Sequence, residues 1–167
     1  MLLQPQRHLA EAPEQGSFAA LMELYENNYI YLRRLVPQLD GKRDAQVSSV
    51  DRGPDLHLEV TERCPYTSSL LLTHRFGPGP GAEALPDLRV RIYHDARVAE
   101  VLPDTAPERL AGVCAGRLAQ TGTLAWRWQV NRFLNRWLRY CLGEGHAFAA
   151  ADPQGSAPRP SARRWAV

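Results

Sequence analysis

Long hydrophobic runs and paired cysteines are absent from this chain of 167 residues. No window approaches the ~18 apolar residues of a membrane-spanning helix, and the first sixteen residues lack the apolar stretch of a secretory signal. The three cysteines, Cys64, Cys114 and Cys141, show no CxxC spacing, which favours buried or half-buried thiols in a reducing compartment. These absences predict a cytoplasmic protein with no membrane anchor and no bound metal or cofactor.

The chain also lacks a large excess of charge of one sign. Twenty basic and eighteen acidic side chains leave a formal charge of +2, which is too small to argue for nucleic acid on charge alone. Lys42 is the sole lysine among the basic residues, and this skew towards arginine is typical of a GC-rich genome. No P-loop, GxGxxG, GxSxG or HExxH motif occurs, which argues against the common enzyme classes.

The patterning predicts a single domain between two loose ends. Residues 1–16 are polar and contain two prolines, which indicates a flexible arm. Residues 149–167 are rich in Ala, Pro, Ser and Gly and predict a disordered tail. The apolar content of 44% and charged content of 23% are those of a globular protein. We therefore expect one folded domain over residues 17–148.

Two long amphipathic helices are predicted at the ends of that domain. Apolar residues recur at three- and four-residue spacing over 17–36 and again over 125–142. Ser17 is placed to cap the first helix and Pro37 to end it, while Gly143 is placed to end the second. A weaker helix is expected over 107–118, where two glycines interrupt the pattern.

Individual side chains of these helices can be assigned to a face. Asn28 falls mostly on the polar side of the first helix. In the last helix Trp137 lies on the apolar stripe and is predicted to be in the core, whereas Trp126 and Trp128 near its start are predicted to be exposed. Exposed tryptophans beside Arg127 and Arg132 could stack on nucleic-acid bases, but such residues more often cover a helix end or contact a protein partner, so nucleic acid is not the expected partner.

Between the helices the apolar period changes from 3.6 to two, which is typical of strands with one wet face. Phe76 is assigned to the inner face and Leu71 to the outer one, and the segment 77–86, with three glycines and three prolines, is expected to be an irregular loop. The other connections are short, so the strands are antiparallel. The fold prediction is α+β: an antiparallel meander of four to five strands, packed on one face by the N-terminal and C-terminal long helices. The expected strands are 56–61, 67–76, 88–93 and 98–102, with a short edge strand over 46–51.

Four strings resemble the YqiB-like family, a bacterial family catalogued as domain of unknown function 1249. They are Leu24-Tyr25-Glu26-Asn27-Asn28-Tyr29, Glu62-Arg63 with Tyr66-Thr67, Val90-Arg91-Ile92-Tyr93-His94-Asp95-Ala96-Arg97, and Gln129-Val130-Asn131 with Trp137-Leu138-Arg139-Tyr140. Their order and spacing fit the family over roughly residues 20–145. The resemblance implies no activity, because the family has no established one. Family members usually carry a polar cluster before the last helix that segment 115–128 lacks.

The family strings supply the candidate site. Two interpretations remain open for the polar residues of these strings. They could form a solvated sheet face with weak ion pairs, or they could line a site whose arginines bind an anionic ligand or a partner's carboxylate. Arg91 and Glu59 would pair if their strands were neighbours. The candidate binding residues are Glu62, Arg63, Tyr66, Arg91, Tyr93, His94, Asp95 and Glu100.

The favoured function is a non-catalytic binding or adaptor module, whose partner is a protein or a small anionic ligand. One alternative is a hydrolase of a phosphate-containing small molecule, with His94 and Asp95 as its acid–base pair and Arg91 as its anion clamp. Neighbouring strand residues point to opposite faces, so this pair converges only if the turn bends it together; otherwise Asp95 makes a turn and His94 is structural. The second alternative is single-stranded nucleic-acid binding through the last helix.

Overall fold

The computed structural model describes residues 16–39, 44–77, 79, 81, 83–105, 110 and 117–148. The predicted tail, nearly all of the predicted arm and most of the expected helix over 107–118 lie outside these residues. No helix within the described ranges is long and apolar enough to cross a membrane. The elements are α1 (Phe18–Leu35), β1 (Ala45–Ser48), β2 (Asp55–Arg63), β3 (Thr67–Phe76), β4 (Glu83–Tyr93), β5 (Val98–Val101) and α3 (Leu124–Gly143).

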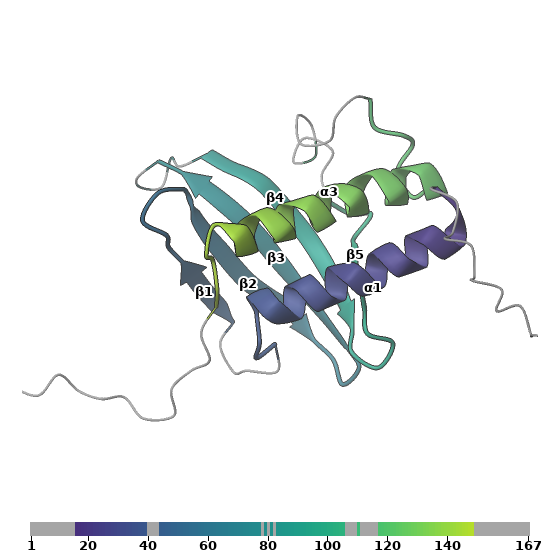
Figure 1. Ribbon diagram of the computed structural model, residues 1–167, viewed down its shortest axis with the longest axis horizontal. Helices are drawn as coiled ribbons and strands as arrows, with labels where there is room; N and C mark the ends of the chain where they lie inside the picture. The colour runs from purple at the N-terminus through teal and green to yellow at the C-terminus, as the bar shows by residue number, and fades with distance from the viewer. Residues whose placement is uncertain are drawn as a thin grey trace, which may run out of the picture.

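The five strands form one antiparallel sheet in the order β1-β2-β3-β4-β5. Helices α1 and α3 lie side by side on one face of this sheet and run in the same direction (Figure 1). The α+β meander packed by two long helices is therefore confirmed. We call the face under the helices the inner face and the opposite one the outer face.

Local signals explain where the helices begin and end. The Ser17 hydroxyl accepts a hydrogen bond from the amide of Ala20 at 3.2 Å, as a cap should. Thr123 caps α3 in the same way. α3 ends at Gly143, as predicted, and Glu144 is its C-cap. The glycine with positive φ is Gly145, at +90°: its own N–H and that of His146 return to carbonyls of the last turn.

The inner face and the helices enclose the core. Leu70, Leu72, Leu88, Val90 and Ile92 of the sheet pack with Leu134, Leu138 and Trp137 of α3. Trp126 was expected to be exposed but is 1% exposed and belongs to this core. Trp128 was also expected to be exposed but is half-buried, because it packs against the cluster of Leu21, Tyr25 and Val98. Phe76 was expected inside but is 49% exposed, because it stands at the end of β3 beyond a register shift. Leu71 lies on the outer face as predicted and is partly covered there.

β4 begins earlier than its sequence indicates. The segment 77–86 was expected to be a loop, yet β4 starts at Glu83 and includes a cis Leu85–Pro86 peptide. Proline has no N–H to give to a ladder and is confined to irregular positions in sheets. The pairing with β3 shifts register between Thr73 and Arg75, opposite Pro86. The irregularity accommodates the proline and lengthens the strand.

A buried asparagine cluster joins both helices to the edge of the sheet. The Asn131 side-chain oxygen accepts a hydrogen bond from the backbone N–H of Val101 in β5 at 3.0 Å. The amide of Asn28 approaches the same oxygen at 3.4 Å, and Asn135 donates to the Asn28 oxygen at 3.1 Å. Asn28 and Asn131 are completely buried. The assignment of Asn28 to the polar side is therefore wrong: that residue faces α3, where a buried polar group has partners.

Two buried histidines lie under the end of α3. The rings of His74 and His146 have centroids 5.4 Å apart, and each residue is 2% exposed. The Trp137 indole donates to His74 Nδ1 at 3.0 Å, and Ser48 Oγ lies 3.1 Å from His146 Nδ1. Burial, together with the neighbouring His146, lowers the pKa of His74 to about 4. Burial also raises the pKa of the adjacent Cys141 thiol to about 12.

We expect Asn131→Ala to destabilise the fold strongly. The change leaves the Val101 N–H and the Asn28 amide without their acceptor, and an unsatisfied buried polar group costs about 1–3 kcal/mol. Urea unfolding should show a loss of about 2–4 kcal/mol. The matched control is Asn27→Ala on the exposed side of α1, which should stay within about 0.5 kcal/mol. Equal effects of the two changes would contradict the structural role of Asn131.

We also expect stability to fall in acid because His74 is buried and neutral. Its folded pKa of about 4 lies below the ordinary value near 6.5, so the unfolded chain binds the proton first. Stability is therefore full above pH 6.5 and declines as the pH falls towards 4, by about 2–3 kcal/mol. Urea titrations between pH 7 and 4 measure this slope. His74→Gln, which keeps an acceptor for Trp137, should flatten the dependence of the unfolding free energy on pH. An unchanged slope would show that groups other than His74 cause the loss of stability in acid.

Candidate functional site

The outer face carries a row of linked polar side chains across three strands. The Arg91 guanidinium of β4 pairs with the Glu62 carboxylate of β2 at 3.2 Å. Between them, Ser69 of β3 donates from its hydroxyl to Glu62 at 3.1 Å and accepts from Arg91 Nε at 3.3 Å. The Glu62 and Arg91 side chains are 51% and 37% exposed. This Glu62–Ser69–Arg91 row is therefore an ordered polar surface that solvent can reach.

A β-bulge in β2 creates this row. The pairing of β2 with β3 shifts register between Val60 and Glu62, and the Thr61 hydroxyl bonds to the Ser69 carbonyl at 3.2 Å. Strict alternation would place Glu62 on the inner face with Leu58 and Val60, so the extra residue turns it outward. The suggested partnership of Arg91 with Glu59 does not form, because β3 separates their strands and Glu62 is in register with Ser69.

Tyr93 and Glu100 belong to a second cluster at the β5 edge. The Tyr93 hydroxyl donates to Glu100 at 3.0 Å, and Arg127 of α3 pairs with the same carboxylate at 2.7 Å. Burial raises the pKa of Tyr93, and it raises the pKa of the adjacent Tyr25 to about 12. Both phenols therefore stay protonated at neutral pH. A pocket of about 380 Å³ opens beside this cluster, lined by Phe18, Leu21, Tyr25, Glu100, Leu124 and Arg127.

His94 and Arg63 form a third cluster at the end of the sheet. His94 Nε2 lies 2.9 Å from the hydroxyl of Ser68, which is in register with the inward Ile92. Arg63 donates to the Leu39 carbonyl at 2.9 Å. Together with exposed Cys64 these side chains border a pocket of about 210 Å³. The exposure of Cys64 corrects the expectation that the thiols are buried or half-buried.

The remaining predicted residues, Tyr66 and Asp95, lie in turns. Tyr66 is 69% exposed, and its carbonyl accepts the backbone N–H of His94 at 2.9 Å. Asp95 is exposed in the β4–β5 turn, and among the described residues no hydrogen bond joins it to His94. The eight predicted residues are thus divided among separate clusters and turns instead of lining one cavity. The described part of the chain contains no group of three or more metal-ligating side chains placed to hold an ion.

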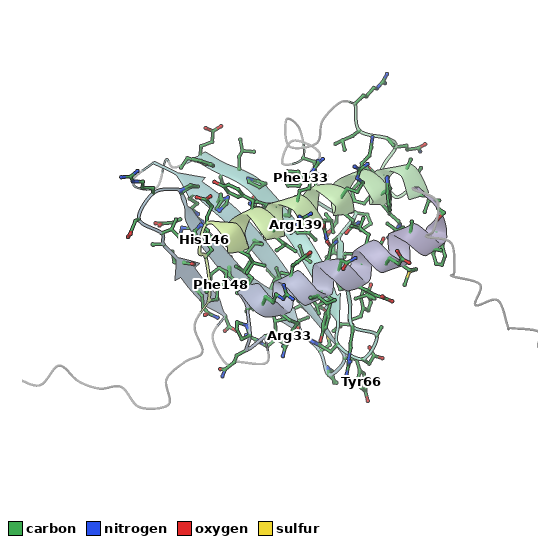
Figure 2. The ribbon with its side chains drawn as sticks, viewed as in Figure 1. Arg33, Tyr66, Phe133, Arg139, His146 and Phe148 are labelled. Atoms are coloured by element: carbon green, nitrogen blue, oxygen red, sulfur yellow. The ribbon has the colours of Figure 1, made fainter. Side chains whose placement is uncertain are left out.

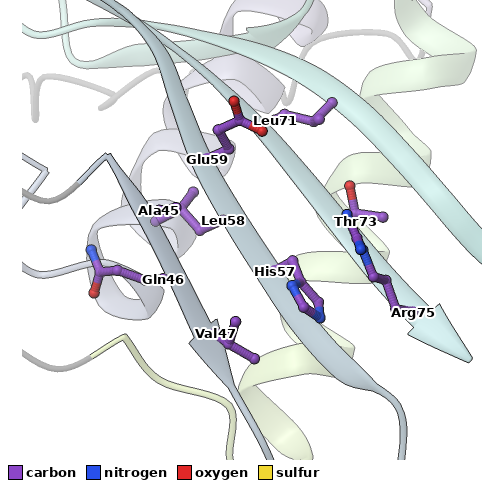
Figure 3. Close-up of a pocket in the computed structure, with 9 residues that line it drawn as sticks. All are labelled: Ala45, Gln46, Val47, His57, Leu58, Glu59, Leu71, Thr73 and Arg75. Atoms are coloured by element: carbon purple, nitrogen blue, oxygen red, sulfur yellow. The ribbon is translucent and has the colours of Figure 1, made fainter. Parts of the chain in front are cut away.

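A hollow of about 270 Å³ on the outer face was not predicted as a site. Figure 3 shows Val47 of β1, His57 and Glu59 of β2, and Thr73 and Arg75 of β3 around it. Burial and the nearby Arg75 lower the pKa of His57, although Asp55 acts in the opposite direction. The alternation of polar and apolar residues correctly predicted that His57 and Glu59 lie on the solvent-facing side of the sheet. The hollow itself could not be predicted in this way, because it also requires the pairing of β2 with β1.

These features define the class: an α+β protein with a five-stranded antiparallel meander covered on one face. A profile of the family described as "Protein of unknown function (DUF1249)" matches residues 31–147. The chain belongs to this family. It is 34% identical over 128 residues to "Uncharacterized protein YqiB" of Escherichia coli K12 and of Escherichia coli O157:H7, an alignment that covers 77% of this chain and 90% of each relative. No solved structure matches.

We expect Arg91→Ala and His94→Ala to cost little stability. Both side chains are partly exposed, and polar surface truncations usually stay within about 0.5 kcal/mol. Leu134→Ala, in the fully buried core, should instead cost about 2–5 kcal/mol. Chemical denaturation compares the three variants. Losses above about 2 kcal/mol for the first two would show that these residues are a structural network and not a site.

Proposed function

We propose that this protein is a non-catalytic binding module that receives an acidic segment of a protein partner on its outer sheet face. The observation that carries the proposal is the Glu62–Ser69–Arg91 row, which holds a half-exposed arginine in a fixed orientation on the face away from the helices. In Figure 1 both helices lie on the viewer's side of the sheet, so the outer face is turned away from the viewer. No described helix covers the outer face, which leaves it accessible to a partner as far as the described residues show.

Preorganisation is what makes Arg91 suited to binding. An arginine already held by hydrogen bonds loses less side-chain entropy when it meets a carboxylate than a free one does. Its Nε donates to Ser69 and one Nη donates to Glu62. A partner's carboxylate that displaces Glu62 would therefore bind a guanidinium group that is already oriented. Leu71, two residues from Ser69 on the same face of β3, adds apolar surface beside the row, and Val47, which is 55% exposed, lines the hollow that Leu71 also borders. The mixture of an anchoring charge with apolar area is typical of interfaces.

The hydrolase alternative receives less support from the geometry. Its acid–base pair requires the His94 imidazole and the Asp95 carboxylate in hydrogen-bond contact. The imidazole instead bonds to Ser68, while Asp95 is exposed in the turn. Arg91, the anion clamp of that alternative, lies in register with Ser69, next to Ile92, and therefore on the opposite face from Ser68.

The test is capture of partners by immobilised protein, compared with two charge-reversal variants. Arg91→Glu removes the anchoring charge, and Arg139→Glu makes the same change on the exposed side of α3. A partner that binds through the outer face should be retained by the wild type and by Arg139→Glu but lost with Arg91→Glu. With that partner purified, we expect Arg91→Glu to weaken binding at least about tenfold. Identical partners and affinities for all three proteins would refute the proposal.

A further inference from the structure

The arginines of the two layers differ in how their charge is balanced. On the sheet, Arg91 pairs with Glu62, Arg89 with Asp104, and Arg63 with Asp44, and Arg127 reaches from α3 to Glu100. The arginines on the outward sides of α1 and α3 lack such carboxylate partners among the described residues. Within the described ranges no ion pair involves Arg33, Arg34, Arg132, Arg136 or Arg139.

Four of these arginines are exposed on two neighbouring helices. Arg132, Arg136 and Arg139 are spaced at three and four residues on the exposed side of α3, opposite its buried Val130, Leu134 and Leu138. Arg34 is exposed near the end of α1. Because α1 and α3 run in the same direction (Figure 1), Arg34 near the end of α1 and Arg139 near the end of α3, the latter labelled in Figure 2, lie towards the same end of the helical layer.

Aromatic rings interleave with these arginines. The Arg132 guanidinium lies 5.7 Å from the centre of a Trp128 ring, and the Arg34 guanidinium lies 5.8 Å from the centre of the Tyr31 ring. Tyr140, one turn after Arg136, is 50% exposed. We call the set Tyr31, Arg34, Trp128, Arg132, Arg136, Arg139 and Tyr140 the basic helical surface.

The chemistry of this surface fits one kind of polyanion best. Arginines that lack a carboxylate partner attract phosphates, and aromatic rings beside them offer platforms for bases. Residues 128 to 140 span about 18 Å along the helix axis, which is long enough to meet several successive phosphates. A membrane-surface helix would need its apolar side free for lipid, but the apolar sides of α1 and α3 are buried against the sheet.

We propose that the basic helical surface binds single-stranded nucleic acid, with the arginines on the phosphates and Trp128 stacked on a base. The site is independent of the outer sheet face, which lies on the other side of the sheet. Binding should be weakly dependent on sequence, because phosphate contacts and stacking do not read base edges. It should also be strongly dependent on salt.

Fluorescence anisotropy with end-labelled (dT)20 and (U)20 in 50 mM NaCl tests the proposal. Arg132→Glu with Arg139→Glu should weaken binding more than tenfold. The matched control reverses two exposed arginines on the sheet side of the molecule, Arg52→Glu with Arg75→Glu, and should change affinity less than threefold. Removing two phosphate contacts should also flatten the plot of log affinity against log salt by about 1.4. Unchanged thermal midpoints show that these exposed substitutions leave the fold intact.

Stacking has its own readout in the fluorescence of Trp128. Addition of (dT)20 should quench the tryptophan emission of the wild type, and Trp128→Phe should remove most of that quenching. Three results would overturn the proposal: no binding of either oligonucleotide at 50 mM NaCl, equal losses in the helix and sheet variants, or tighter binding to phosphatidylglycerol vesicles or to polyglutamate that Arg132→Glu with Arg139→Glu abolishes. The last two probes separate a nucleic-acid site from a membrane or acidic-protein site.

Discussion

The hydrogen bond from the Val101 N–H to the Asn131 side chain is the contact on which the arrangement of the layers depends. Every sheet has two edges, and an edge N–H that is buried under a helix must find a partner. Asn131 supplies that partner from α3, and Asn28 of α1 approaches the same oxygen. One side chain therefore fixes both helices in position along β5, in a way that nonpolar packing, which is not directional, cannot.

Neighbouring contacts reinforce this junction and determine which surfaces stay free. One turn before Asn131, Arg127 reaches Glu100, and Leu21 and Tyr25 of α1 pack on Val98. The helices are thereby held at the β5 side of the inner face. The open outer face follows from this arrangement, since two helices held together on the inner face cannot also cover the other one. The free surfaces of the protein are consequences of the buried asparagines.

Periodicity alone predicts the meander and both helices, because alternation and the 3.6-residue stripe are local properties of the chain. It misplaces Asn28, because periodicity assigns every polar residue to the exposed side of a helix. The buried hydrogen-bond partner of Asn28 is Asn131, which lies more than a hundred residues away in the sequence. Periodicity also cannot find the bulge at Thr61, which depends on pairing with β3 and which brings Glu62 to Arg91. The candidate residues were thus named from the sequence, but their division into separate clusters depends on tertiary pairing.

The two layers use arginine in different physical ways. On the outer face Glu62 neutralises the charge of Arg91, and Ser69 holds its guanidinium in place. The electric field of this arginine is therefore small at a distance, and the arginine is suited to binding at short range through its fixed geometry. On the helices Arg34 and Arg132 lie over aromatic rings and form no ion pair with a described residue, so their charge is not neutralised at short range. A sheet separates the two surfaces. A chain with a formal charge of only +2 thus balances its arginines in two ways. On the sheet they form ion pairs, whereas on the helical layer the exposed carboxylates of Glu23, Glu26 and Glu144 form no ion pair with a described arginine.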